Sequence, residues 1–90
     1  MLFVAFIETD VARIKELAEA AIKRGDVEGL KTVGSYGTPV GKGVHIFDAD
    51  SEEAVFKYYT PELPFLKNLE VYPALPLEKV IPFHMLALQS

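Results

Sequence analysis

Three side chains of this 90-residue sequence have the chemistry of acid–base catalysis: His45, Glu70 and Tyr72. An imidazole can accept and donate a proton near neutral pH, and a carboxylate or a phenol can orient it. If the aliphatic residues of each strand face the helices, these three side chains share the opposite face of a sheet. The sequence therefore predicts His45, with Tyr72 or Glu70, as a catalytic group in a cavity there. The alternative is that they lie in a subunit interface and satisfy one another or water.

Further side chains are expected to form the walls of a ligand site. Mostly apolar walls with a few polar groups are the usual composition of a small-molecule pocket. The residues assigned to ligand binding are Tyr36, Phe47, Lys31 and Ser35. The expected ligand is small and apolar or aromatic. These assignments depend on strand register, because a shift of one residue would turn every side chain to the other face.

The first elements are a buried strand over 2–7 and a helix over 10–24. The strand is a short apolar run bounded by polar residues. Thr9 is the expected N-cap of the helix, with Asp10 in its first turn, where a negative charge is favourable. Gly25 is the expected C′ residue that ends the helix.

Three further strands are expected, over 29–36, 44–47 and 69–72. The glycine- and proline-containing segment 37–43 makes the first two a hairpin. Pro73 cannot donate to a hydrogen-bonded ladder, so the last strand should lie at a sheet edge or end there.

A second helix is expected to start where Asp50 serves as N-cap and Glu53 completes a capping box. It must stop before Pro61, because the residue preceding a proline avoids helical backbone angles. A proline-punctuated loop over 61–67 follows. The domain is expected to span 1–78, and 79–90 is interpreted as an apolar arm packed on the body or on a neighbouring subunit.

This order, βαββαβ, predicts an α+β fold of the ferredoxin-like type, an antiparallel four-stranded sheet with two helices on one face. The first strand, Leu-Phe-Val-Ala-Phe-Ile, is apolar on both faces, and two helices can cover only one of them. An uncovered apolar face would exceed the patches that soluble monomers usually expose. We therefore expect a second copy of the chain to cover it, as a homodimer or a higher oligomer.

Two segments carry a resemblance to the dimeric α+β barrel superfamily, in which two ferredoxin-like sheets pack face to face. They are residues 43–54 (Gly-Val-His-Ile-Phe-Asp-Ala-Asp-Ser-Glu-Glu-Ala) and residues 69–76 (Leu-Glu-Val-Tyr-Pro-Ala-Leu-Pro). They are similar to an uncharacterised branch with a glycine-led strand, an acidic helix start and a proline-containing end to the last strand. Relatives in the superfamily include isomerases, cofactor-free monooxygenases, heme-handling enzymes and effector-binding domains, so the fold does not specify an activity.

Composition excludes several classes of function. The formal net charge is −4 and the basic residues are scattered, so no nucleic-acid or anionic-membrane footprint is present. Without cysteine there are no disulfides or thiolate sites, which fits a cytoplasmic protein. No apolar run approaches the ~20 residues of a membrane span, and the first strand lacks the basic flank of a signal peptide. With few side-chain amides and many Glu and Lys, the composition is that expected of a thermophile.

The two histidines are far apart in the sequence, so no metal site is expected, and no cofactor. Two functional hypotheses remain. The first is a small-molecule-binding or assembly module. The alternative is a cofactor-independent isomerase or monooxygenase that uses His45 with Tyr72 or Glu70 in the barrel cavity.

Overall fold

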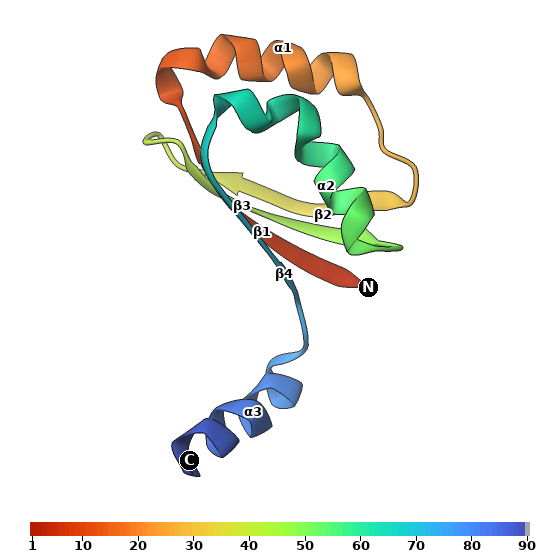
Figure 1. Ribbon diagram of the computed structural model, residues 1–90, viewed down its shortest axis with the longest axis vertical. Coiled ribbons are helices and arrows are strands. Elements are labelled where there is room, and N and C mark those ends of the chain that lie inside the picture. Colours follow the sequence, from red (N-terminus) through yellow and green to blue (C-terminus); the bar gives the residue numbers. More distant parts are fainter. Residues whose placement is uncertain (90) are drawn as a thin grey trace.

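The computed structural model describes residues 1–89 and contains one open, four-stranded antiparallel sheet (Figure 1). The strands lie in the order β2-β3-β1-β4. Their bounds are β1 Leu2–Thr9, β2 Leu30–Gly37, β3 Lys42–Ala49 and β4 Leu66–Pro73. The predicted hairpin is confirmed as the β2–β3 pair, and the predicted edge position of the last strand is confirmed for β4. The α+β architecture is compatible with a ferredoxin-like fold.

The first helix, α1 (Ile14–Arg24), begins later than predicted because a short 3-10 helix, η1 (Val11–Arg13), precedes it. The N-cap prediction for Thr9 was wrong, because β1 extends to that residue and the side chain of Asp10 caps η1 by accepting from the Ala12 amide. Gly25 ends α1 with a φ of +65°, which confirms the predicted helix end.

The second helix, α2 (Glu52–Tyr59), is capped by Ser51, whose hydroxyl accepts from the Ala54 amide. The prediction of Asp50 as its N-cap was therefore wrong by one residue, as adjacent polar residues can both serve. The segment predicted as an irregular loop forms a second 3-10 helix, η2 (Thr60–Phe65), before β4 starts.

The core lies between the sheet and α2, and both α1 and α2 are on the same side of the sheet (Figure 1). Helix α1 packs chiefly against η2 and buries none of its own residues completely. The buried apolar residues come from β1, β3 and α2: Phe3, Ala5, Phe47, Ala49, Ala54, Val55 and Tyr59. This cluster fixes which face of each strand points toward the helices.

The other face of the sheet has no helix over it among residues 1–89 (Figure 1). Register pairs Val4 with Ile46 and Phe6 with Val44 on this open face. Phe6 is 46% exposed, and its ring lies edge-on to Tyr72 with centroids 6.2 Å apart. The sheet therefore has one packed face and one open face with an apolar centre.

A third helix, α3 (Leu77–Gln89), follows β4 and extends away from the sheet (Figure 1). The predicted arm is thus helical over all its described length, and Ser90 lies outside the described residues. Several large apolar side chains of α3 are exposed, among them Leu77, Phe83 and Leu88. Its packing on a neighbouring subunit stays a prediction. No helix of residues 1–89 is long and apolar enough to cross a membrane.

Candidate functional site

His45 lies on the helix-facing side of β3, in the centre of a group of buried polar contacts. In β3 its side chain shares a face with that of Phe47, which is completely buried. Its register partner on β1 is Ala5, also completely buried in the core. The prediction that His45 and Phe47 face the open side was therefore wrong. The prediction assumed that the aliphatic residues of each strand face the helices. In β3 the aliphatic Val44 and Ile46 take the open face instead, because Phe47 packs in the core under α2.

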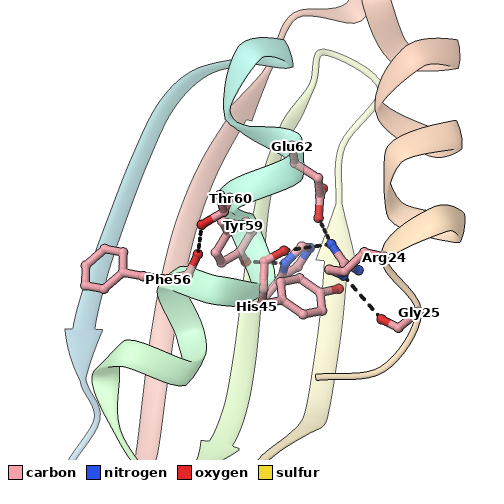
Figure 2. A network of polar contacts seen from close by, with 8 residues as sticks. Arg24, Gly25, His45, Phe56, Tyr59, Thr60 and Glu62 are labelled. Atoms are coloured by element: carbon pink, nitrogen blue, oxygen red, sulfur yellow. Dashed lines mark hydrogen bonds and ion pairs between the residues drawn. The ribbon is translucent and has the colours of Figure 1, made fainter. Parts of the chain in front are cut away.

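His45 Nδ1 and the Tyr59 hydroxyl from α2 lie 2.5 Å apart (Figure 2). The two rings stack at 9° with centroids 5.9 Å apart. Partial burial of the imidazole, reinforced by the nearby Arg24 cation, holds the pKa of His45 below its ordinary value of 6.5. Burial also raises the pKa of Tyr59 far above its usual range. Both groups are consequently neutral at pH 7.

An ion pair between Arg24 at the end of α1 and Glu62 in η2 closes the other side of this network (Figure 2). The two side chains are only 10% and 6% exposed. Arg24 also donates to the Tyr58 carbonyl oxygen at 2.8 Å, and its guanidinium lies 3.6 Å from the Tyr58 ring centroid. The pair thus ties α1 to the segment that follows α2.

A cavity of about 240 Å³ adjoins His45 on the same side of the sheet. It lies between the start of α1 and the β2–β3 hairpin. Its lining includes Ile7, Ile14, Ser35, Lys42 and His45. A second cavity of about 510 Å³ lies near the end of α1, where Arg24 and Tyr58 line it. Polar side chains of the network thus reach two hollows beside the helices.

Glu70 and Tyr72 lie on the open face of β4, opposite to the face of His45. The Tyr72 hydroxyl donates to Glu70 at 2.8 Å. This hydrogen bond raises the pKa of Tyr72. The structure therefore brings Glu70 and Tyr72 together but does not join either of them to His45.

A β-bulge separates two of the predicted ligand residues. Alternation along a regular strand places Lys31 and Ser35 on one face, but the register shifts between Thr32 and Gly34. Lys31 consequently pairs with Asp48 on the open face, whereas Ser35 pairs with His45 on the helix side. The prediction that they share a face was wrong.

Of the four predicted ligand residues, Ser35 and Tyr36 line the cavity beside His45, and Lys31 lines the larger one. Phe47 lines neither cavity and is part of the core. The structure therefore brings together Ser35 and His45, whereas Tyr36 pairs with Val44, so its side chain points to the open face.

Sequence reasoning missed Arg24 and Glu62 and treated Tyr59 as packing. Glu62 could have been noticed, because it is the one acidic residue in the proline-punctuated loop 61–67. The sequence could not identify Arg24 as its partner, because the pairing depends on the packing of α1 against η2.

Stability is expected to fall on acidification through His45. The pKa of His45 is lower in the folded protein than in the unfolded chain, so the unfolded chain binds the proton more tightly. The contribution of His45 to the stability of the fold is therefore complete above pH 6.5, and it is lost as the pH falls toward the pKa of the folded state. In urea titrations, His45→Gln should lessen the loss of stability between about pH 7 and pH 5. The matched control is His84→Gln on exposed α3, which should follow the original chain. Identical pH profiles for all three proteins would contradict the prediction.

The fold and the site define a small α+β protein with a partly buried His–Tyr pair. Comparison with known families adds one match, to a domain of unknown function (DUF3303), over residues 1–87. This match covers nearly the whole chain, and the chain therefore belongs to that family. No curated protein matches it. Within residues 1–89, no group of three or more acidic or histidine side chains is placed to hold a metal ion.

Proposed function

We propose that the chain is a homodimeric assembly module with a ferredoxin-like subunit, in which the open faces of two sheets pack together as a dimeric α+β barrel. The observation that carries this proposal is the apolar centre of the open face. Phe6 and Tyr72 are each nearly half exposed there, with Val4, Val44 and Ile46 beside them. A contiguous apolar patch with a polar margin is typical of a protein interface.

The charged residues at the margin of the open face support the same proposal. Register places Lys31 opposite Asp48 and Glu8 opposite Lys42. These pairs lie toward the ends of the strands. Glu70 is the carboxylate nearest the centre, opposite Phe6 in the register, and it accepts a hydrogen bond from the Tyr72 hydroxyl there. A two-fold axis through the centre would bring the apolar residues of both copies together.

The area of the open face also favours an interface to which α3 contributes. Four strands of eight residues cover a footprint of roughly 500 Å², from a spacing of ~4.8 Å and a rise of ~3.4 Å per residue. A stable interface typically buries about 800 Å² per partner. Helix α3 is ~20 Å long at 1.5 Å per residue, and its exposed Phe83 and Leu88 would add much of the difference by packing on the neighbouring subunit.

Phe6→Lys tests the proposal. The new ammonium group lies opposite Glu70 in the register, which favours the folded subunit, while it places a charge in the proposed interface. The dimer should dissociate roughly a hundredfold more readily, the size of effect seen when an interface hot spot is lost. Ile22→Lys on α1, where the side chain is 82% exposed on the helix side, should leave association unchanged.

Native mass spectrometry and sedimentation velocity measure this, with circular dichroism to verify the fold of each variant. A monomeric original chain at micromolar concentration would sink the proposal, as would equal weakening by Phe6→Lys and Ile22→Lys.

A second candidate function is acid–base catalysis, favoured by the neutral, partly buried His45 with its Tyr59 partner. Since His45 faces the helices, such chemistry would take place in the cavity beside α1 and not between the sheets. Glu70 and Tyr72 would then have no part in it.

A further inference from the structure

We propose that the cavity beside His45 binds a small organic molecule that presents a carbonyl or carboxylate oxygen to the Nε2–H group of His45. This site lies within one subunit, on the helix side of the sheet, and does not depend on the proposed dimer. Two features support this site: the tautomer that Tyr59 imposes on His45, and the side chains that line the cavity.

The Tyr59 hydroxyl fixes the tautomer of His45. Tyr59 is completely buried, and its hydroxyl proton has one acceptor among residues 1–89, the Nδ1 atom 2.5 Å away. If Nδ1 carried the imidazole proton, the buried phenol proton would have no acceptor, which is costly. The favoured arrangement is therefore a phenol that donates to Nδ1 and an imidazole protonated at Nε2.

The Nε2–H group is free to meet a ligand. Within residues 1–89, Nε2 has no hydrogen-bond partner, yet no buried side-chain nitrogen or oxygen is left unsatisfied there. Nε2 is consequently accessible, and His45 is one of the residues that line the cavity. The imidazole presents a hydrogen-bond donor to any molecule in it, and the complementary group is an acceptor oxygen.

The remaining walls define the rest of the ligand. Ile7 and Ile14 offer apolar contacts, and the Ser35 hydroxyl lies on the strand next to His45. Lys42 also borders the cavity, but its register position opposite Glu8 directs its side chain to the open face, so the acceptor need not be charged. The volume of about 240 Å³ lies just below the ~300–1,000 Å³ of drug-sized sites, so a molecule with a single ring fits.

The larger cavity near Arg24 is the weaker candidate. Its lining cation already pairs with Glu62 and donates to two backbone carbonyl oxygens. A ligand there would have to compete with these contacts, whereas Nε2–H of His45 has no such competitor among the described residues.

The tautomer is tested first, by the imidazole ¹⁵N chemical shifts of labelled protein above pH 7. Nε2–H is expected, and Nδ1–H would overturn the proposal. Tyr59→Phe keeps the ring but removes the donor to Nδ1, and should shift the tautomer population. Tyr72→Phe is the matched control, because it also loses a hydroxyl hydrogen bond, but on the open face. Equal ¹⁵N spectra for Tyr59→Phe and the original chain would likewise contradict the proposal.

Binding is tested by following amide shifts on titration with acetophenone, benzoate and ethylbenzene. At least one of the two oxygen-bearing probes should bind roughly tenfold more tightly than ethylbenzene, about the value of one hydrogen bond, and shift residues of this cavity. Comparison of benzoate with acetophenone separates a carboxylate acceptor from a carbonyl acceptor. Equal affinity for all three probes, or shifts confined to the open face, would overturn the proposal.

The outcome is independent of the proposed dimer. Binding should persist in Phe6→Lys, whose substitution lies on the opposite face, and it should weaken severalfold in Ser35→Ala and Tyr59→Phe. Loss of binding in Phe6→Lys with its fold intact would mean that the ligand site lies between subunits, contrary to this inference.

Discussion

Glu62→Ala is expected to lower the free energy of unfolding by about 3–5 kcal/mol, because it leaves the Arg24 guanidinium buried without its carboxylate. The whole domain is worth only about 5–13 kcal/mol at ~0.05–0.15 kcal/mol per residue, so this single change removes a large share of its stability. The affected contact joins α1 to η2, which is also the main packing contact of α1.

The matched control is Glu16→Ala, which breaks a second Arg–Glu pair in the same chain. Arg13 and Glu16 lie 2.7 Å apart, but their side chains are 42% and 51% exposed. Solvent screens such a pair, and its loss should cost less than about 1 kcal/mol. Urea unfolding followed by circular dichroism gives both values. Equal losses for Glu62→Ala and Glu16→Ala would show that the buried pair does not hold α1 in place.

A double-mutant cycle separates the ion pair from the burial of its charges. Arg24→Met with Glu62→Met removes both charges and keeps the apolar volume. The double variant should therefore be more stable than either single variant, Arg24→Met or Glu62→Met, because each single change leaves one buried charge without its partner. If the double variant is less stable than the single variants, the packing of the Arg24 side chain against Tyr58 outweighs the effect of the buried charges.

Phe47→Ala is expected to cost about 3–5 kcal/mol, the usual range for removing a fully buried phenylalanine. The Phe47 ring lies 4.9 Å from Tyr58 and 5.9 Å from Tyr59, between centroids, and 5.8 Å from the His45 ring. Its removal would leave a cavity directly beneath α2, which the surrounding aromatic rings cannot fill without moving the His45–Tyr59 pair.

Phe56→Ala provides the comparison, because Phe56 lies on the same helix-covered side but is 48% exposed. Its loss should cost less than about 1 kcal/mol, since alanine also has the higher helix propensity. Thermal and urea unfolding measure the loss of stability in both variants. A small effect of Phe47→Ala would return this residue to the ligand-binding role that the sequence suggested for it.

How far the sequence could predict the site depends on β1 and β2. β1 is apolar on both faces, so alternation within it does not indicate which side meets the helices. The prediction therefore depends on β3, where the pattern assigns the aliphatic Val44 and Ile46 to the core. In the structure Phe47 is the core residue, and His45 is accommodated beside it because Tyr59 arrives from α2.

The bulge in β2 could not be predicted from the alternation of apolar and polar residues either. It inserts one residue between Thr32 and Gly34, and nothing in the local sequence except the glycine signals it. Local signals did succeed where a single residue decides the conformation. Gly25 ends α1, and Pro73 marks the end of an edge strand, because both depend on the backbone of one residue and not on tertiary packing.

The same bulge affects how the sheet can meet other chains. A regular, exposed edge strand invites another strand to add to it, which leads to open-ended aggregation. β2 forms one edge, and its bulge interrupts the row of backbone donors and acceptors. β4 forms the other edge and ends at Pro73, which has no amide to donate. Both lateral borders thus resist strand addition, so self-association through the flat face would stop at a closed pair instead of growing into a fibril.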